Sequence, residues 1–188
     1  MSPLLVDIGN TRIKWARLAG VRPARGRAAV HSGWGPADYA RRLFGGVRNC
    51  GRVLVSSVAG ERVNRSLAAA ARRAGATCEF VRVPRHAGGV SVGYAEPWRL
   101  GVDRFVALVG AHALFPAEPL CVVGAGTALT VDLLGPDGRH RGGVIVPAPA
   151  LMVETLLART HGIRRRARGG ALRGTGLFAR STRDAILR

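Results

Sequence analysis

The chain has little lysine and few acidic side chains. Of its 29 basic residues only Lys14 is a lysine, and 11 acidic residues leave a formal net charge of +18. A basic surface attracts phosphate backbones and other polyanions. The arginines, however, are spread along the chain and accompany abundant alanine and glycine. The composition therefore indicates a coding bias towards arginine, and we do not expect nucleic acid as the partner.

Long apolar runs are also missing. None approaches the roughly 18 residues needed to cross a bilayer, and Met1-Ser2-Pro3 lacks the basic region and apolar stretch of a secretory signal. We therefore expect a cytoplasmic protein without a membrane partner.

Cysteine is scarce and matches no zinc pattern. Cys50, Cys78 and Cys121 are odd in number, far apart and unaccompanied by suitably spaced histidines. We expect reduced, mostly buried thiols. With 188 residues and 47% hydrophobic content, the chain can bury a core, as one large domain or two small ones.

Hydrophobic periodicity predicts alternating strands and helices, which is typical of an α/β protein. Strands are expected near 4–8, 13–18, 28–32, 52–57, 78–83, 120–124, 128–134 and 140–146. Helices are expected near 37–46, 61–74, 150–160 and 181–188, with a further helix after a loop at 84–100. We place an N-terminal half at 1–115 and a C-terminal half at 116–188.

The most informative segment is a strand that runs through Asp7 into a Gly9-Asn10 turn and a second strand. A Gly-Asn pair tolerates the positive φ angles of a tight hairpin, and Gly9 lets backbone N–H groups approach an anion. Thr11 and Lys14 add a hydroxyl and an ammonium, while Asp7 could hold a metal ion or its water. The alternative is an ordinary hairpin with a polar turn.

A second segment, from Leu120 to Asp132, repeats the pattern of strand, glycine turn and strand. If Gly126 is laid on Gly9, Thr127 falls on Asn10 and Gly124 falls on Asp7. Two such units suggest a duplicated fold whose halves face a shared cleft, each turn holding part of a polyphosphate. This organisation resembles the superfamily of actin, hexokinase and the heat-shock chaperone ATPases, with ribonuclease H-like halves. The alternative is a chance similarity of two glycine hairpins.

Between the halves, Asp103 and Arg104 follow Gly101 at an expected helix N-terminus. Asp103 could accept a proton from a substrate hydroxyl as that oxygen attacks phosphorus. Arg104 could bind a carboxylate or phosphate in bidentate fashion. The alternative is an N-capping aspartate beside a surface arginine.

Arginines also cluster late in the chain. We expect a solvated, mobile loop there, and the alternative is a contact for an anion or partner. The cluster comprises Arg159, Arg164, Arg165, Arg166, Arg168 and Arg173.

Six motifs in order resemble the type III pantothenate kinase family, which phosphorylates pantothenate in the first step of coenzyme A synthesis. They are Asp7-Ile8-Gly9-Asn10-Thr11 with Lys14, Ser56-Ser57-Val58, the block from Tyr94 to Arg104, Gly126-Thr127-Ala128 with Thr130 and Asp132, Gly142-Gly143 through Pro147 and Met152, and Ser181-Thr182-Arg183-Asp184-Ala185-Ile186. Some relatives are described as accessory factors for transcription, so a non-catalytic regulatory or binding protein is the alternative function.

The resemblance implies a set of site residues. ATP phosphates would be held by Asp7, Ile8, Gly9, Asn10, Thr11, Arg12, Ile13 and Lys14, with Thr127 contacting them from the other half. Pantothenate would be bound by Tyr94, Gly101, Val102, Asp103 and Arg104, with Asp103 as the proton acceptor and Thr182 reaching across a homodimer interface. Mg²⁺ is expected beside the triphosphate, anchored through Asp7.

Two departures from the family stand out. The family has an aspartate at the position of Gly124, and that carboxylate helps to bind a monovalent cation such as K⁺ or NH₄⁺, which leaves this cation site in doubt. The family also continues beyond the position of Arg188, so we expect the second half of the duplicated fold to be incomplete.

Overall fold

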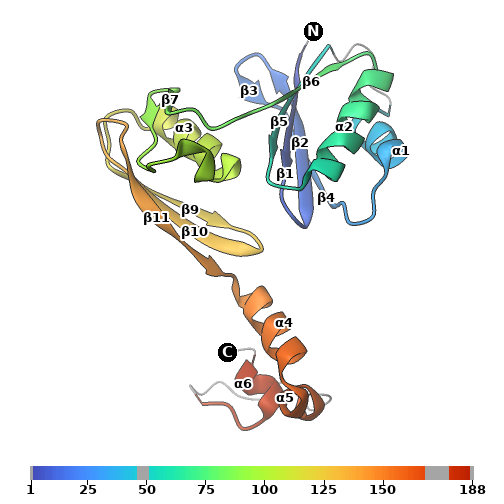
Figure 1. Cartoon of the computed structure of the whole chain (residues 1–188), viewed down its shortest axis with the longest axis vertical. Helices are drawn as coiled ribbons and strands as arrows, with labels where there is room; N and C mark the ends of the chain where they lie inside the picture. The colour runs from blue at the N-terminus through green and yellow to red at the C-terminus, as the bar shows by residue number, and fades with distance from the viewer. Residues whose placement is uncertain (1, 46–50, 168–177, 187–188) are drawn as a thin grey trace. The chain divides into compact units, whose positions relative to one another are not determined.

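The computed structural model describes residues 2–45, 51–167 and 178–186 (Figure 1). Its contacts divide the chain into a first unit, Met1–Val122 with Asp132–Gly143, and a second unit, Val123–Val131 with Val144–Arg188. The division into halves at residues 115 and 116 stays a prediction.

The first unit is built on a six-stranded sheet. Its strands are β1 (Leu4–Ile8), β2 (Arg12–Ala19), β3 (Arg22–Pro23), β4 (Arg27–Val30), β5 (Arg52–Ser57) and β6 (Thr77–Phe80). The order is β3-β2-β1-β5-β6, with β4 also paired to β2. The β1–β2 and β2–β4 pairs are antiparallel, and the β1–β5 and β5–β6 pairs are parallel. All five predicted strands of this segment are therefore confirmed within a few residues.

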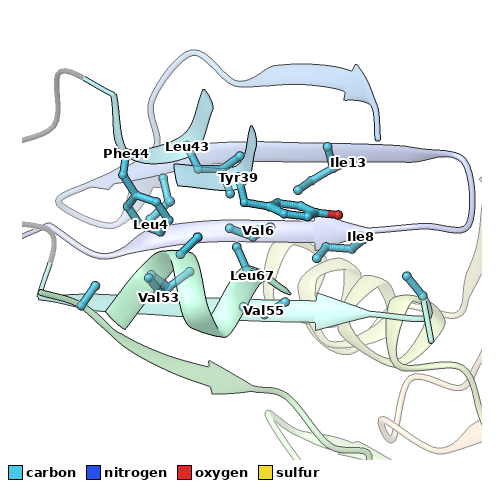
Figure 2. Close-up of a cluster of buried hydrophobic side chains, with 14 residues drawn as sticks. Leu4, Val6, Ile8, Ile13, Tyr39, Leu43, Phe44, Val53, Val55 and Leu67 are labelled. Atoms are coloured by element: carbon cyan, nitrogen blue, oxygen red, sulfur yellow. The ribbon is translucent and has the colours of Figure 1, made fainter. Parts of the chain in front are cut away.

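Two helical segments cover one face of this sheet (Figure 2). They are α1 (Pro36–Tyr39), which continues as the π-helical turn η1 (Ala40–Phe44), and α2 (Glu61–Arg73). Leu4, Val6 and Ile8 alternate along β1 and are buried, because successive side chains of a strand point to opposite faces. Against them packs the apolar side of the helices, including Tyr39 and Leu67.

A second core cluster of the first unit forms around α3 (Val102–Leu114). It contains Phe105 and Leu108 of α3 and Val90 of a short hairpin, β7 (His86–Ala87) and β8 (Val90–Ser91). A helical turn, η2 (Pro97–Arg99), precedes α3. The prediction that 84–100 is all loop was therefore wrong.

The remaining strands form a three-stranded sheet in the order β11-β10-β9. They are β9 (Leu120–Ala125), β10 (Ala128–Leu134) and β11 (His140–Pro147). The helices of the second unit are α4 (Pro149–Arg159), α5 (His161–Arg166) and α6 (Thr182–Ile186). These elements match the predicted strands and helices, apart from α5.

Two smaller predictions need correction. Arg164, Arg165 and Arg166 belong to α5 rather than to a loop, while Arg168 and Arg173 lie outside the described residues. Cys121 is exposed and Cys78 is half-buried, so the prediction of mostly buried thiols was wrong for Cys121, and Cys50 lies outside the described residues. Among the described residues, no helix has the length and apolar character to cross a membrane.

Candidate active site

The turn between β1 and β2 is a four-residue loop that opens with Gly9. Ile8 and Ile13 are the last paired residues, and the Gly9 N–H donates to the Arg12 carbonyl at 2.9 Å. Neither Gly9 nor Asn10 has a positive φ, so that part of the hairpin prediction was wrong. Four residues between the paired positions reverse the chain without the left-handed conformation that a two-residue turn needs. Asn10 and Arg12 are exposed.

Asp7 lies in a row of polar residues across three strands. It is in register with Lys14 of β2 and Ser56 of β5, so the three side chains point to the same face of the sheet. That face is opposite to the one on which Val6 and Ile8 are buried. The Lys14 Nζ lies 3.5 Å from the Asp7 Oδ2 in a solvent-accessible pair. Such a pair contributes little to folding, so both groups can serve a ligand.

Ser56 belongs to this row, although its sequence motif did not predict it as a site residue. Its Oγ is buried and has no hydrogen-bond partner within the described residues. A parallel pairing of β1 and β5 would have pointed to Ser56, because the carboxyl ends of two parallel strands lie at the same edge of a sheet. Asp7 and Ser56 both lie near those ends.

The second glycine turn, between β9 and β10, belongs to the second unit. The Gly126 N–H donates to the Ala128 carbonyl at 3.0 Å, and the Thr127 carbonyl accepts from the Ala148 N–H at 3.2 Å. Ala148 is the N-cap residue of α4, so this turn is attached to a helix N-terminus. A Cβ at Gly124 would lie 2.6 Å from the Thr130 Oγ1, so the Thr130 hydroxyl occupies the space of a side chain there.

Arg104 is buried and held by Asp132. Its Nε donates to Asp132 Oδ2 at 2.8 Å and its Nη2 donates to Oδ1 at 2.5 Å. The Arg104 and Asp132 side chains are 5% and 3% exposed. These hydrogen bonds raise the pKa of the Arg104 guanidinium against the opposing effect of its burial, so the group carries a permanent charge.

Two aromatic rings complete the buried cluster. The Arg104 Nη1 donates to the Tyr94 hydroxyl at 3.2 Å, and the His140 Nε2 donates to Asp132 Oδ1 at 2.9 Å. The Tyr94 and His140 rings stack with centroids 5.6 Å apart. Three of the five N–H groups of Arg104 are thus engaged within the described residues, which leaves two for a ligand. Asp132 lies in one of the sequence motifs, which predicted no role for it, and His140 lies in none of them.

Asp103 has the opposite environment, since its side chain is exposed. It lies in the first turn of α3, whose N-cap residue is Gly101, and its Oδ1 accepts from the Arg104 N–H at 2.9 Å. A Cβ at Gly101 would lie 2.5 Å from the Asp103 Oδ1, so the glycine makes room for the carboxylate. The alternative of an N-capping aspartate beside a surface arginine is therefore wrong on both counts.

The expected site residues are divided between the two units. Asp7 to Lys14, Tyr94 and Gly101 to Arg104 belong to the first unit, and Thr127 and Thr182 belong to the second. Thr182 is half-buried at the start of α6, where the Ser181 Oγ accepts from the Asp184 N–H at 3.2 Å. Within the described ranges, no group of three or more histidine, cysteine or acidic side chains could hold a metal ion.

Comparison with known proteins identifies the family. A model of the type III pantothenate kinases matches residues 3–188. The chain belongs to the type III pantothenate kinase family. Curated relatives of that name include proteins from Halorhodospira halophila (40% identity, covering 97% of this chain and 72% of the relative), Xanthomonas euvesicatoria pv. vesicatoria (39%, 85% and 63%) and Nitrosococcus oceani (35%, 85% and 62%). The chain thus spans between about three fifths and three quarters of these relatives' length.

A solved structure supports the fold. A putative 2-dehydro-3-deoxygalactonokinase from Sinorhizobium meliloti aligns with a TM-score of 0.56 at 14% identity, covering 92% of this chain and 62% of that one. The chain has the α/β fold class of the actin-like ATPases, as its two glycine hairpins predicted. At this identity the likeness concerns the fold and not the substrate.

Proposed function

We propose that this chain catalyses the ATP-dependent phosphorylation of pantothenate to 4'-phosphopantothenate, the first step of coenzyme A synthesis. One observation carries the proposal. An exposed carboxylate, Asp103, stands next in sequence to a buried arginine, Arg104, whose guanidinium is fixed by Asp132. A base for a hydroxyl and a binding group for a carboxylate are therefore held at one helix N-terminus, and pantothenate carries both a hydroxyl and a carboxylate. Membership of the family supports this assignment.

In this proposal, the β1–β2 hairpin binds the phosphates of ATP. The Gly9 turn offers backbone N–H groups, Thr11 a hydroxyl and Lys14 an ammonium, and the neighbours Ile8, Asn10, Arg12 and Ile13 complete the motif. Thr127 would contact the phosphates from the second glycine turn. Mg²⁺, when bound, neutralises charge on the phosphates, and Asp7 would hold it through water.

Pantothenate would bind at the N-terminus of α3. The two remaining N–H groups of Arg104 would take its carboxylate, and Tyr94, Gly101 and Val102 would line the pocket. Asp103 would accept the proton of the attacking hydroxyl while that oxygen forms its bond to the γ-phosphorus and ADP leaves. Thr182 of another protomer would close the pocket in a cytoplasmic homodimer.

We also propose that any dependence on K⁺ or NH₄⁺ is weak. Gly124 offers no carboxylate at the position where the family carries one, and the Thr130 hydroxyl fills the adjacent space. A hydroxyl is a neutral ligand, so it attracts a monovalent cation less than a carboxylate does.

The direct test incubates the 188-residue chain with pantothenate, ATP and Mg²⁺ and follows the product by mass spectrometry. We expect a new species heavier than pantothenate by one phosphoryl group, formed together with ADP. Pantothenyl alcohol, which lacks the carboxylate, should be a poor substrate through a raised KM. A chain that binds both ligands without forming product would instead support the non-catalytic alternative.

A further inference from the structure

The carbonyl groups of the glycine turn are held from one side by His31, the residue that follows β4. The His31 Nε2 lies 2.8 Å from the Gly9 carbonyl oxygen, and the His31 backbone N–H donates to the Thr11 carbonyl at 3.3 Å. One residue therefore holds the first and the third residue of the turn.

Tyr39 of α1 fixes the histidine in turn. Its hydroxyl lies 3.2 Å from the His31 Nδ1, and the two side chains are almost fully buried, at 5% exposure for His31 and 0% for Tyr39. Figure 2 shows the Tyr39 ring lying against the β1–β2 hairpin, with its hydroxyl at the end where Ile8 and Ile13 lie. Trp34 packs edge-on against both rings, at centroid distances of 6.4 Å and 5.3 Å.

The hydrogen-bond directions follow from the chemistry of the partners. A carbonyl oxygen only accepts, so Nε2 carries the proton, and in the neutral imidazole Nδ1 must then accept. Tyr39 is therefore the donor of the second bond. Burial, and to a lesser degree the neighbouring Asp38, raises the pKa of Tyr39, which keeps its hydroxyl protonated.

This arrangement determines where the next N–H groups point. In a trans peptide the C=O and the following N–H point in opposite directions, and the described residues contain no cis peptide. Because the Gly9 and Thr11 carbonyls point towards His31, the N–H groups of Asn10 and Arg12 point away from it. Backbone N–H groups that point away from the buried side of an exposed turn are placed to donate to an anion.

We propose that His31 and Tyr39 are positioning residues for nucleotide binding: they hold the Gly9 turn so that the Asn10 and Arg12 N–H groups face a phosphate. This inference rests on the proposed function, in which the turn binds ATP. Neither residue touches the nucleotide. Their loss acts on ATP affinity through the turn and leaves the pantothenate pocket at α3 unchanged.

The test compares two amides at position 31. Glutamine places its amide nitrogen near the Nε2 position and can still donate to Gly9, whereas asparagine reaches only the Nδ1 position. We expect His31→Asn to weaken ATP binding about tenfold, as for the loss of one hydrogen bond, and His31→Gln to restore most of it. Calorimetry with MgATP and, separately, with pantothenate gives both affinities, and pantothenate affinity should change less than about twofold.

Tyr39→Phe is the second variant, because it removes one oxygen and keeps the buried ring. It should weaken ATP binding about threefold, through a histidine that is less well fixed. The matched control is His86→Asn, the same substitution at an exposed histidine of β7 that bonds to the Ser91 Oγ at 2.9 Å. ATP affinity should be unchanged in it.

Several outcomes overturn the inference. They are equal losses of ATP affinity in His31→Asn and His31→Gln, an unchanged affinity in His31→Asn, or a parallel loss of pantothenate affinity. A wild-type chain that binds pantothenate but no nucleotide would overturn the proposed function, and the inference with it. Unchanged ATP affinity in Tyr39→Phe alone would remove Tyr39 from the proposed pair.

Discussion

At the residue scale, Asp103 and Arg104 are neighbours in sequence with opposite environments. One helix turn exposes the carboxylate and buries the guanidinium. A proton acceptor has to reach its substrate, whereas an anion-binding arginine gains selectivity from being fixed. In the proposed reaction, the exposed residue of the pair would accept the proton and the buried residue would bind the anion.

Replacing Asp103 by asparagine tests the base directly. The amide keeps the shape but accepts no proton, so kcat should fall about 10²- to 10⁴-fold while the Kd for ATP stays near the wild-type value. Steady-state kinetics and calorimetry measure the two quantities. Asp137→Asn, at an exposed aspartate of the β10–β11 turn, is the control. Wild-type turnover in Asp103→Asn would exclude this residue as the base.

Asp132→Asn should destabilise the fold strongly. The change leaves the buried Arg104 charge without its counter-charge, which typically costs about 3–5 kcal/mol. Glu79→Gln is the matched control, because Glu79 pairs with Arg52 at 2.7 Å on an exposed surface, where such pairs contribute about 0–1 kcal/mol. Urea unfolding gives both free energies. Equal losses in the two variants would contradict a special role for the buried pair.

At the scale of elements, the strands and helices with clear periodicity were predictable, and the shortest elements were not. β7 and β8 have two residues each, so they carry no alternation, and their turn depends on Gly88 and Gly89 with φ of 59° and 79°. From the sequence alone, two consecutive glycines predict a loop and not a hairpin of two short strands.

The candidate site was predictable in part, for a related reason. Gly9, Asp103 and Arg104 lie in local patterns, whereas the partner of Arg104, Asp132, is 28 residues away along the chain. The residues next to Arg104 in the sequence do not predict that a distant aspartate neutralises its charge. His140 is harder still, because a single histidine in a strand has no pattern of its own.

Two glycines allow a paired prediction about elements. A Cβ at Gly93 would lie 2.1 Å from the His140 carbonyl oxygen, whereas a Cβ at Gly110 of α3 would meet nothing within 4 Å. Gly93→Ala should therefore destabilise the protein by about 1–3 kcal/mol, because backbone has to move. Gly110→Ala should stabilise it by about 0.5–1 kcal/mol, since alanine favours a helix interior.

Thermal or urea unfolding measures the two glycine variants side by side. A Gly93→Ala protein as stable as wild type would show that the β8–α3 connection accommodates a methyl group. A destabilised Gly110→Ala would place an unexpected neighbour on that face of α3.

At the scale of the whole molecule, apolar side chains of the second unit remain on the surface. Val123, Val144, Ile145 and Met152 are each at least half exposed. Exposed apolar groups are typical of interaction surfaces, and a symmetric pair of chains covers such groups on both partners at once.

We therefore predict a homodimer at micromolar concentration, measured by sedimentation velocity. Ile145→Glu should shift the protein towards the monomer, because it would bury a charge in the interface. Val21→Glu, at a residue of the first unit that is 94% exposed, should leave the dimer intact. A well-folded wild-type monomer would contradict the proposed pocket that Thr182 of another protomer would close.

The pairing of β1 also bears on the order in which the chain folds during synthesis. One edge of β1 pairs with β2 across a short turn. The other edge pairs with β5, in which Val53, the partner of Leu4, follows 53 − 4 = 49 positions later in the chain. Local pairings form before distant ones, because closing a long loop costs chain entropy. The hairpin that carries the glycine turn can thus exist early on the ribosome with one bare strand edge, which is the point where a newly made chain is open to pairing with another.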